Sequence, residues 1–266
     1  MPINNLIRTV SDNTPDPERA LKNLDRLLRQ SPAFLEEHSA HLEDIARLFS
    51  YSQFLADYST GNLSSLSRAL KDRPVTIDKQ KILSGAYNEY SAFRNEELTT
   101  LYKEKAMKLL REIKRNYLLS VTLNDISGVT SLNECMSELS ILSEALIEFA
   151  LDMSFTLMRR RFGLMRENEF SIIGLGKLGA SELNYSSDID IITIYRSEES
   201  ISTGVLNPFG IRYNRISSHE YFCTLTEILT NLLQSPTEDG IAYRVDLRLR
   251  PNGQKGASSL SLDSYR

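Results

Sequence analysis

Apolar residues recur every three or four positions over most of the first 165 residues, which is the spacing of one face of an α-helix. The string Asp-Pro-Glu at residues 16–18 is typical of a helix start, with an N-cap candidate followed by proline and an acid. Apolar stripes of the same spacing continue through residues 41–58, 96–123 and 132–158. Glycine, which weakens helices, is scarce in this part of the chain. We therefore predict an all-helical domain over residues 1–165.

After the helical domain, short apolar runs bounded by glycine, proline and aspartate replace the long stripes. Residues 170–176, 188–195 and 241–251 are typical of strands, and residues 218–235 are typical of an amphipathic helix. Strands and helices mixed in this way behind a helical region indicate an α+β fold, with helices flanking a mixed β-sheet. We assign this second domain to residues 166–266. We expect the chain to stop within it, because its end, SLSLDSYR, carries no capping signal or polar tail.

The composition is that of a soluble globular protein, with 41% hydrophobic and 25% charged residues. A net charge of −4 gives no indication of binding to nucleic acid or to an anionic membrane. No apolar run approaches the roughly 20 residues of a membrane span, and the start lacks a signal peptide, so we expect a cytoplasmic protein. Cys135 and Cys223 are far apart in sequence, which argues against structural zinc and against a disulfide framework.

The string GLGKLG at residues 174–179 follows the first predicted strand and has the Gly-x-Gly-x-x-Gly spacing of dinucleotide-binding turns. Only residues 177–187 separate Gly176 from Asp188, where the next predicted strand begins, whereas a dinucleotide fold needs a longer crossover with a full helix. A Walker-type phosphate loop also fails, because Lys177 is followed by Leu178 rather than by serine or threonine. The turn instead predicts backbone N–H groups at a helix start that can bind an anion.

Asp188 and Asp190 stand at the beginning of the second predicted strand, before the apolar run IITIY. Side chains alternate along a strand, so the two carboxylates point the same way, about 6–7 Å apart. Like charges at the rim of a buried strand repel each other, and a divalent cation between them removes that penalty. Mg²⁺ in particular binds one or two carboxylates together with substrate phosphates. Capping or turn aspartates are the alternative, and they explain one residue easily but the pair poorly.

Asp246 repeats this arrangement on the third predicted strand, whose charged face carries Arg244, Asp246, Arg248 and Arg250. An exposed salt-bridge ladder is one explanation of that face. The other is that Asp246 completes a three-carboxylate metal site, while Arg248 and Arg250 offer N–H donors to phosphate oxygens. We expect the three carboxylates to converge on one site for metal-dependent phosphoryl or nucleotidyl transfer.

Other classes of chemistry have little support in the sequence. The chain contains no Gly-x-Ser-x-Gly, His-Glu-x-x-His or Cys-His signature of hydrolases and metalloproteases. Its three histidines are His38, His41 and His219. His38 and His41 lie three residues apart on a predicted helix, and we expect both to be surface residues rather than metal ligands.

The glycine turn followed by Ser-Asp-x-Asp at residues 187–190 resembles the nucleotidyltransferase superfamily related to DNA polymerase β. Residues 174–195 and 240–266 are similar to the glutamine synthetase adenylyltransferase/deadenylylase family, and residues 109–151 resemble the helical region that precedes its motif. The match is specific, because Gly-Lys-Leu-Gly, Glu-Leu-Asn, Ser-Ser-Asp-x-Asp and Val-Asp-x-Arg-Leu-Arg-Pro occur in that order.

This resemblance implies a nucleotidyltransferase-type sheet and a site that uses Mg²⁺ or Mn²⁺, a nucleotide (ADP or ATP) and phosphate. The implied roles are metal ligation by Asp188, Asp190 and Asp246, and binding of phosphate oxygens by Gly176, Lys177, Arg248 and Arg250. Ser187 would orient a carboxylate or touch a phosphate, and a loop serine that only satisfies the backbone is an equal alternative. Ala180 and Ala257 depart from the family pattern of glycine and proline, and both lie beside the implied ligands.

Members of the family carry two such domains, of which the N-terminal one removes AMP from glutamine synthetase and the C-terminal one adds it. Residues 182–190, ELNYSSDID, follow a single helical region and are more similar to the N-terminal version. The resemblance thus implies deadenylylation, in which phosphate attacks adenylyl-tyrosine and releases ADP, with glutamine synthetase and the PII signal protein as partners. Adenylyl transfer from ATP is the first alternative. A non-catalytic regulatory domain is the second, and the complete set of three aspartates argues against it.

Overall fold

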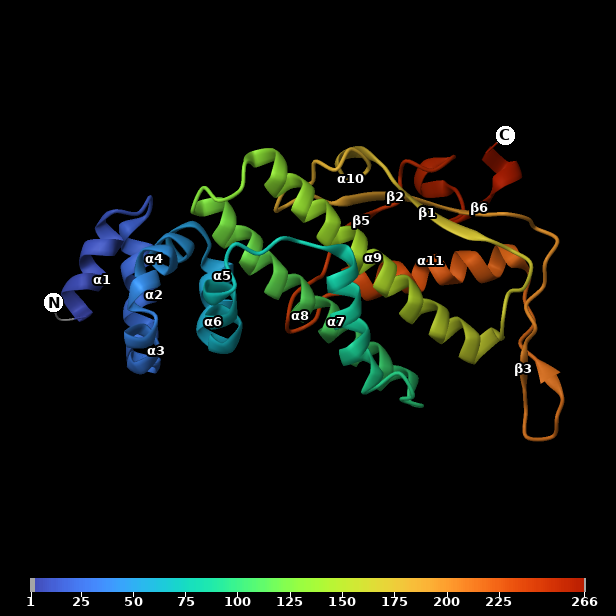
Figure 1. Cartoon of the computed structure of the whole chain (residues 1–266). Helices are drawn as coiled ribbons and strands as arrows, with labels where there is room; N and C mark the ends of the chain where they lie inside the picture. Colours follow the sequence, from blue (N-terminus) through green and yellow to red (C-terminus); the bar gives the residue numbers. More distant parts are fainter. Residues whose placement is uncertain (1–2, 266) are drawn as a thin grey trace. The chain divides into compact units, whose positions relative to one another are not determined.

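The computed structural model describes residues 3–265, apart from the side chain of residue 254. The chain divides into two compact units, the helical unit (Met1–Ile77 with Arg115–Glu138) and the sheet unit (Asp78–Lys114 with Leu139–Arg266). Helices make up the described part of the helical unit, whereas the sheet unit combines helices with strands (Figure 1). The predicted domain boundary near residue 165 follows the change from helix to strand. It stays a prediction, because the division into units crosses two long helices instead.

Short helices build the N-terminal part of the helical unit. They are α1 (Ile3–Asp12), α2 (Pro17–Gln30), α3 (Pro32–Glu37), α4 (Leu42–Tyr51), α5 (Gln53–Gly61) and α6 (Leu63–Lys71), with a 3₁₀ turn at Ser39–His41. The predicted start of α2 is confirmed, because the Asp16 carboxylate accepts a hydrogen bond from the Arg19 N–H at 3.0 Å. The predicted apolar stripes face inward, and Leu24 of α2 and Phe49 of α4 are fully buried.

His38 is buried, so the expectation that it lies on the surface is wrong. Its ring stacks on the Phe34 ring with 4.2 Å between centroids, and the residue is only 2% exposed. The Nδ1 atom lies 3.0 Å from the Phe34 carbonyl oxygen, and Nε2 lies 2.9 Å from Ser67 Oγ. Because both ring nitrogens find partners, the imidazole can be buried at little cost. This histidine therefore contributes to the packing of α3 against α6.

Longer helices follow, and three of them agree with the predicted stripes over residues 96–123, 132–158 and 218–235. The longer helices are α7 (Lys79–Ser91), α8 (Thr99–Ile126), α9 (Leu132–Phe162) and α11 (Ser218–Gln234). Helix α7 lies within the predicted helical domain but matches no predicted stripe. The first strand begins at Phe170, and the described residues before it contain no strand, as predicted. Among the helices of residues 3–265, none is long and apolar enough to cross a membrane.

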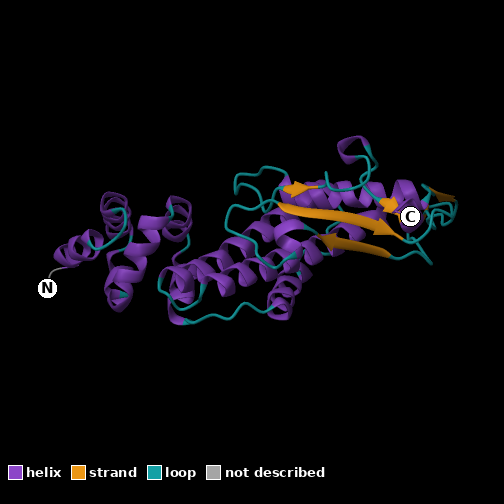
Figure 2. Cartoon of the chain, turned by 90° about the horizontal axis from the view of Figure 1, so that it is seen from above, coloured by secondary structure: helices purple, strands orange, loops and turns teal. Residues whose placement is uncertain are grey.

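The sheet unit contains a small mixed sheet with β2 at its centre (Figure 2). Its strands are β1 (Phe170–Gly174), β2 (Ile189–Tyr195), β5 (Val245–Asp246) and β6 (Leu260–Ser261). Strand β1 pairs antiparallel with one edge of β2, and β5 and β6 pair parallel with the other. A separate hairpin joins β3 (Val205–Leu206) to β4 (Arg212–Tyr213). The predicted α+β fold with a mixed sheet is thus confirmed.

The third predicted strand, residues 241–251, is far shorter in the structure, because β5 contains only Val245 and Asp246. The Arg248 N–H donates a hydrogen bond to Asp246 Oδ1 at 2.8 Å, which closes a turn two residues after the aspartate. Such a side-chain turn competes with strand pairing, so the chain leaves the sheet directly after Asp246. Leu249, which the predicted strand over residues 241–251 would include, is 58% exposed.

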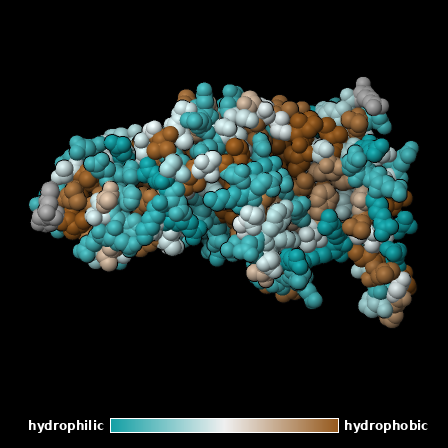
Figure 3. Space-filling view, viewed as in Figure 1, coloured by the Kyte–Doolittle hydropathy of each residue, from teal (hydrophilic) through white to brown (hydrophobic). Residues whose placement is uncertain are grey.

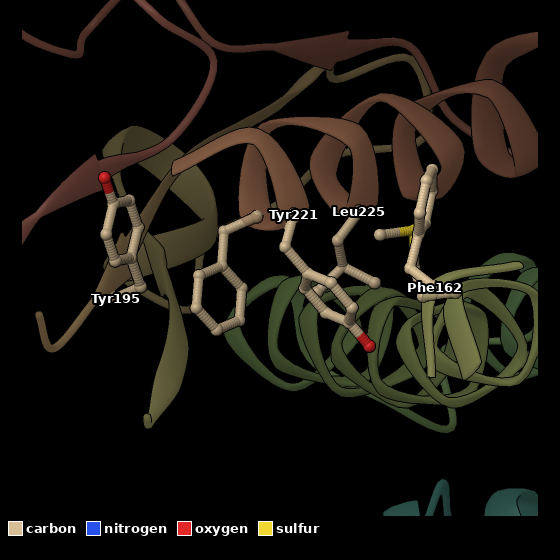
Figure 4. Close-up of a cluster of buried hydrophobic side chains, with 6 residues drawn as sticks. Phe162, Tyr195, Tyr221 and Leu225 are labelled. Atoms are coloured by element: carbon tan, nitrogen blue, oxygen red, sulfur yellow. The ribbon is translucent and has the colours of Figure 1, made fainter. Parts of the chain in front are cut away.

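An aromatic cluster fixes β1 and β2 against α9 and α11. Phe222 of α11 stacks on Phe170 of β1 and on Tyr195 of β2, with 5.2 and 5.0 Å between ring centroids. Figure 4 shows Tyr195 together with Tyr221 and Leu225 of α11 and Phe162 of α9 in this cluster. Alternate residues of β2 are buried, as a strand with one face on a helical layer requires. The cluster therefore holds the strand from which the candidate site begins.

The β3–β4 hairpin carries apolar side chains that remain exposed. Leu206, Phe209 and Ile211 lie at or next to its turn, and Phe209 is 87% exposed. They contribute to the brown surface at the lower right of Figure 3. This hairpin supplies a control for the buried aromatic cluster, because its phenylalanine makes few packing contacts.

We predict that Phe222→Ala lowers the free energy of unfolding of the sheet unit by about 3–5 kcal/mol, because it removes a ring stacked on two others and leaves a cavity. Phe209→Ala, at the exposed hairpin, should change it by less than about 0.5 kcal/mol. Urea unfolding followed by circular dichroism measures both. Similar losses in the two variants would contradict the packing described for the cluster.

Candidate active site

The glycine turn lies directly against the start of β2 (Figure 1). It forms one helical turn, α10 (Gly176–Gly179), and the Leu175 N–H donates to the Asp190 carbonyl at 2.8 Å. Gly176 has φ +52, and a Cβ there would lie 2.6 Å from Asp190 Oδ2. A Cβ on Gly179 would lie 2.6 Å from the Gly174 carbonyl oxygen. The glycine spacing is therefore explained by close packing of the turn on itself and on an aspartate carboxylate, not by a dinucleotide.

Asp190 and Asp246 lie opposite each other on the parallel strands β2 and β5. Paired residues of neighbouring strands point to the same face and are separated by about 4.8 Å, so the two carboxylates are brought together. Burial, followed by the negative charges of Asp246 and Asp188, raises the pKa of Asp190. The positive charge of Arg248 partly offsets this shift. A half-buried pair of like charges thus occupies the rim of the sheet.

The Asp246 carboxylate is held by Arg248 from the turn that follows β5. Arg248 Nε lies 3.0 and 2.7 Å from the two carboxylate oxygens, and Nη2 donates to Oδ2. The side-chain and backbone hydrogen bonds from Arg248 lower the pKa of Asp246 below its usual range. The Asp246 side chain is 13% exposed and that of Arg248 is 66% exposed. Arg248 therefore lies beside the aspartate pair, in contact with one carboxylate, and its binding of phosphate oxygens stays a prediction.

Asp188 lies at the edge of the same site and pairs with Arg244, whose Nε donates to Asp188 Oδ1. Arg244 Nη2 also donates to the Ser186 carbonyl at 3.1 Å, and its own carbonyl accepts the Ile189 N–H at 2.9 Å. Sequence reasoning placed Arg244 on the charged face but gave it no role. Its position two residues before Asp246, on the same face, is the signal that would have indicated one.

Ser187 closes the loop that precedes β2. Its hydroxyl donates to Asn184 Oδ1 at 2.7 Å and accepts the Asn184 N–H at 3.2 Å. This arrangement agrees with the alternative of a structural loop serine, and contact with a phosphate stays a prediction. Lys177 projects from α10, is exposed, and forms no ion pair with any residue in the described part of the chain. Its ammonium group is thus available to an anion at the glycine turn.

Arg250 contacts the backbone in this structure. Its Nε donates to the Ala257 carbonyl at 2.8 Å, and its Nη2 donates to the Gly256 carbonyl at 3.1 Å. These bonds fasten the loop that follows β5. A role for Arg250 in binding phosphate stays a prediction, because its donors are directed at carbonyl oxygens. Of the two arginines predicted to bind phosphate, Arg248 lies directly on a predicted ligand.

The donor set suits a hard divalent cation. Asp190 and Asp246 offer carboxylate oxygens on one face, and Mg²⁺ binds through one or two carboxylates plus waters and substrate phosphates. Among residues 3–265, no three His, Cys, Asp or Glu side chains are grouped closely enough to hold a metal as they stand. Asp188 is paired with Arg244, so a three-carboxylate site remains a prediction. The fit to a divalent cation therefore rests on Asp190 and Asp246.

Comparison with known proteins places this arrangement in a family. Residues 42–266 match the family described as glutamate-ammonia ligase adenylyltransferase. The chain is 30% identical over 188 residues to the bifunctional glutamine synthetase adenylyltransferase/adenylyl-removing enzyme of Mannheimia haemolytica, over 68% of this chain and 19% of the relative. It is 35% identical over 163 residues to the enzyme of the same name from Nitrosomonas europaea, over 58% of this chain and 17% of the relative.

A third relative extends the similarity along nearly the whole chain. The enzyme of the same name from Hahella chejuensis is 25% identical over 282 residues, which cover 98% of this chain and 27% of the relative. Across these three proteins the chain spans between 17% and 27% of the relative's length. The similarity therefore concerns one region of much longer proteins.

We predict that Gly176→Ala lowers the free energy of unfolding by about 1–3 kcal/mol, because alanine would be strained in the left-handed backbone of this position and its Cβ would meet the Asp190 carboxylate. Gly85→Ala is a matched control on the exposed side of α7, where an added Cβ meets no atom within 4 Å. It should raise stability by about 0.5–1 kcal/mol. Urea titrations of both variants measure the difference. Equal effects of the same sign would contradict the close approach of the turn to Asp190.

Proposed function

Because the chain belongs to the glutamate-ammonia ligase adenylyltransferase family, we propose that it removes AMP from adenylylated glutamine synthetase by metal-assisted phosphorolysis. An oxygen of inorganic phosphate forms a bond to the phosphorus of the tyrosine-linked AMP. The bond from that phosphorus to the tyrosyl oxygen breaks, and the tyrosyl oxygen keeps the electron pair and takes up a proton. The products are ADP and unmodified tyrosine. The observation that most supports this proposal is the pairing of Asp190 with Asp246.

The chain's own residues provide binding and charge for this reaction. Asp190 and Asp246 would hold Mg²⁺ or Mn²⁺, with Asp188 as a third ligand once it leaves Arg244. A bound divalent cation would polarise the phosphoryl oxygens and stabilise the charge that develops on them. Arg248 presents a planar set of N–H donors beside the carboxylates, a geometry suited to phosphate oxygens.

Other residues extend the proposed site toward the phosphate groups. The backbone of Gly176 and the ammonium group of Lys177 would bind phosphate oxygens at the turn beside Asp190. Ser187 and Arg250 are weaker candidates, because both side chains already contact the protein. The named activity of the relatives supports glutamine synthetase as the substrate. Regulation by the PII signal protein, use of ATP or ADP and a cytoplasmic location belong to the same proposal.

Adenylyl transfer from ATP onto glutamine synthetase is the second candidate. The name shared by the relatives includes both the adenylyltransferase and the adenylyl-removing activity, and one site of this kind suits either direction. A regulatory domain without catalysis is less well supported, because the paired aspartates and the adjacent arginine are all present. Two assays separate the two directions. One supplies phosphate with adenylylated glutamine synthetase, and the other supplies ATP with the unmodified enzyme.

We predict ADP formation in the phosphate assay and a drop of at least about a hundredfold for Asp190→Asn, since a metal ligand contributes about 3 kcal/mol or more to transition-state stabilisation. Without metal, the variant should melt at the same or a slightly higher temperature, because one of two facing charges is removed. Asp72→Asn, at an exposed position in the helical unit, serves as the control.

Wild-type protein should gain thermal stability from Mg²⁺ or Mn²⁺ that Asp190→Asn lacks, because a ligand that binds only the native state stabilises it. Activity only in the ATP assay would replace the proposed direction with its reverse. Full activity of Asp190→Asn in the phosphate assay would show that the aspartate pair is not the site.

A further inference from the structure

Arg111 of α8 is almost completely buried, although its guanidinium group is always charged. Its Nε donates to the Gly240 carbonyl at 2.9 Å, and Nη1 donates to the Leu232 carbonyl at 3.0 Å. Nη2 donates to the Ser235 carbonyl. Leu232 is in the last turn of α11, where carbonyl groups lack helical partners and carry partial negative charge. Arg111 therefore ties α8 to the end of α11 and to the segment that follows it.

Lys114 lies one helical turn further along the same face of α8. Its ammonium group donates to the Ala242 carbonyl and lies 4.2 Å from the centre of the Tyr243 ring. The same segment is fastened to α11, because the Leu233 carbonyl accepts the N–H groups of Ala242 and Tyr243 at 2.9 and 3.0 Å. The stretch from Gly240 to Tyr243 is thus held from two helices.

This stretch runs directly into the candidate site. Arg244, which pairs with Asp188, follows Tyr243, and its carbonyl accepts the Ile189 N–H at 2.9 Å. Val245 then pairs with Ile189, and Asp246 pairs with Asp190. Strand β5 has only these two paired residues, so its own ladder supplies few bonds to fix its position. The anchoring of residues 240–243 by α8 must therefore contribute strongly to the placement of Asp246.

We propose that Arg111 and Lys114 are positioning residues, which through residues 240–243 set the place of Asp246 opposite Asp190 and so the affinity of the site for a divalent cation. The proposal rests on the proposed function, because it takes the aspartate pair as the metal ligands. Neither side chain needs to touch metal or substrate. Their effect passes through the backbone carbonyls of Gly240 and Ala242.

Lys114 allows positioning to be separated from stability. Burial, followed by the positive charges of Arg111 and Arg244, lowers the pKa of Lys114 to about 8. Burial of this charged ammonium group therefore costs free energy in the native fold. Methionine has a side chain of similar length without the charge, so Lys114→Met removes that cost but leaves the Ala242 carbonyl without its donor. Because these two effects on the free energy of unfolding oppose each other, the melting temperature should change little. A role in stability alone would lower the melting temperature instead.

The test compares Mn²⁺ binding by calorimetry, melting temperature and amide hydrogen exchange of residues 240–246 in the wild type and two variants. Lys114→Met should bind Mn²⁺ about three- to tenfold more weakly, somewhat less than the loss typical for partners in direct contact with metal ligands. Exchange at residues 240–246 should rise, and the melting temperature should change little. Lys108→Met is the matched control, since Lys108 is on the same helix, is 64% exposed and pairs only loosely with Glu112. It should change none of the three.

Unchanged Mn²⁺ affinity in Lys114→Met overturns the proposal. A loss of affinity accompanied by a clear fall in melting temperature also overturns it, because loss of stability would then explain the weaker binding. Lys114→Arg, which keeps a donor and the charge, should recover at least part of the affinity. Wild-type protein that binds no Mn²⁺ overturns the metal site and the positioning role together. The Mn²⁺ affinities of the wild type and the variants could follow the predicted order while the wild type forms no ADP from adenylylated glutamine synthetase. That result overturns the proposed reaction and leaves the positioning role intact.

Discussion

Asp190 and Asp246 face each other across two parallel strands, and the repulsion between these like charges is the constraint on which the rest of the site depends. The two carboxyl groups respond to this repulsion differently. Arg248 neutralises Asp246 and lowers its pKa, whereas Asp190 stays partly buried with a raised pKa. Two carboxylates held this close raise the free energy of the metal-free protein, because their charges repel each other. Binding of a divalent cation between them would remove that repulsion. This arrangement supports the proposed binding of a cation and of phosphate groups, and with it the proposed reaction.

The neighbouring elements are shaped by the same pair. The turn that covers Asp190 needs glycine at 176, since any side chain would meet the carboxylate. The aromatic cluster around Phe222 fixes β2, and with it Asp190, against α9 and α11. Asp246 has no comparable strand to hold it, because β5 is two residues long. Its position depends instead on the contacts that α8 and α11 make with residues 240–243, which accounts for a buried arginine and a lysine so far in sequence from the aspartate pair.

Much of this could be predicted from sequence, because it follows from local periodicity. Helical spacing gave the helices, and the alternation around Asp188 and Asp190 indicated a strand with two carboxylates on one face. The length of β5 could not be predicted, since the turn that ends it depends on one side chain returning to the backbone. The partners of Arg250 could not be predicted either, and the contacts of Arg111 join residues more than 120 positions apart. On a helix, such an arginine is indistinguishable by pattern from a solvated one.

Anomalous diffraction from crystals of the protein grown with Mn²⁺ shows directly whether the aspartate pair binds a divalent cation. We expect a peak between Asp190 and Asp246, with oxygens of both carboxylates about 2.0–2.3 Å from the ion. We also expect that the Arg248 guanidinium no longer holds both oxygens of Asp246. A site that stays empty at saturating Mn²⁺, or a peak elsewhere while Arg248 still holds Asp246 as in the present structure, would contradict the proposed metal site.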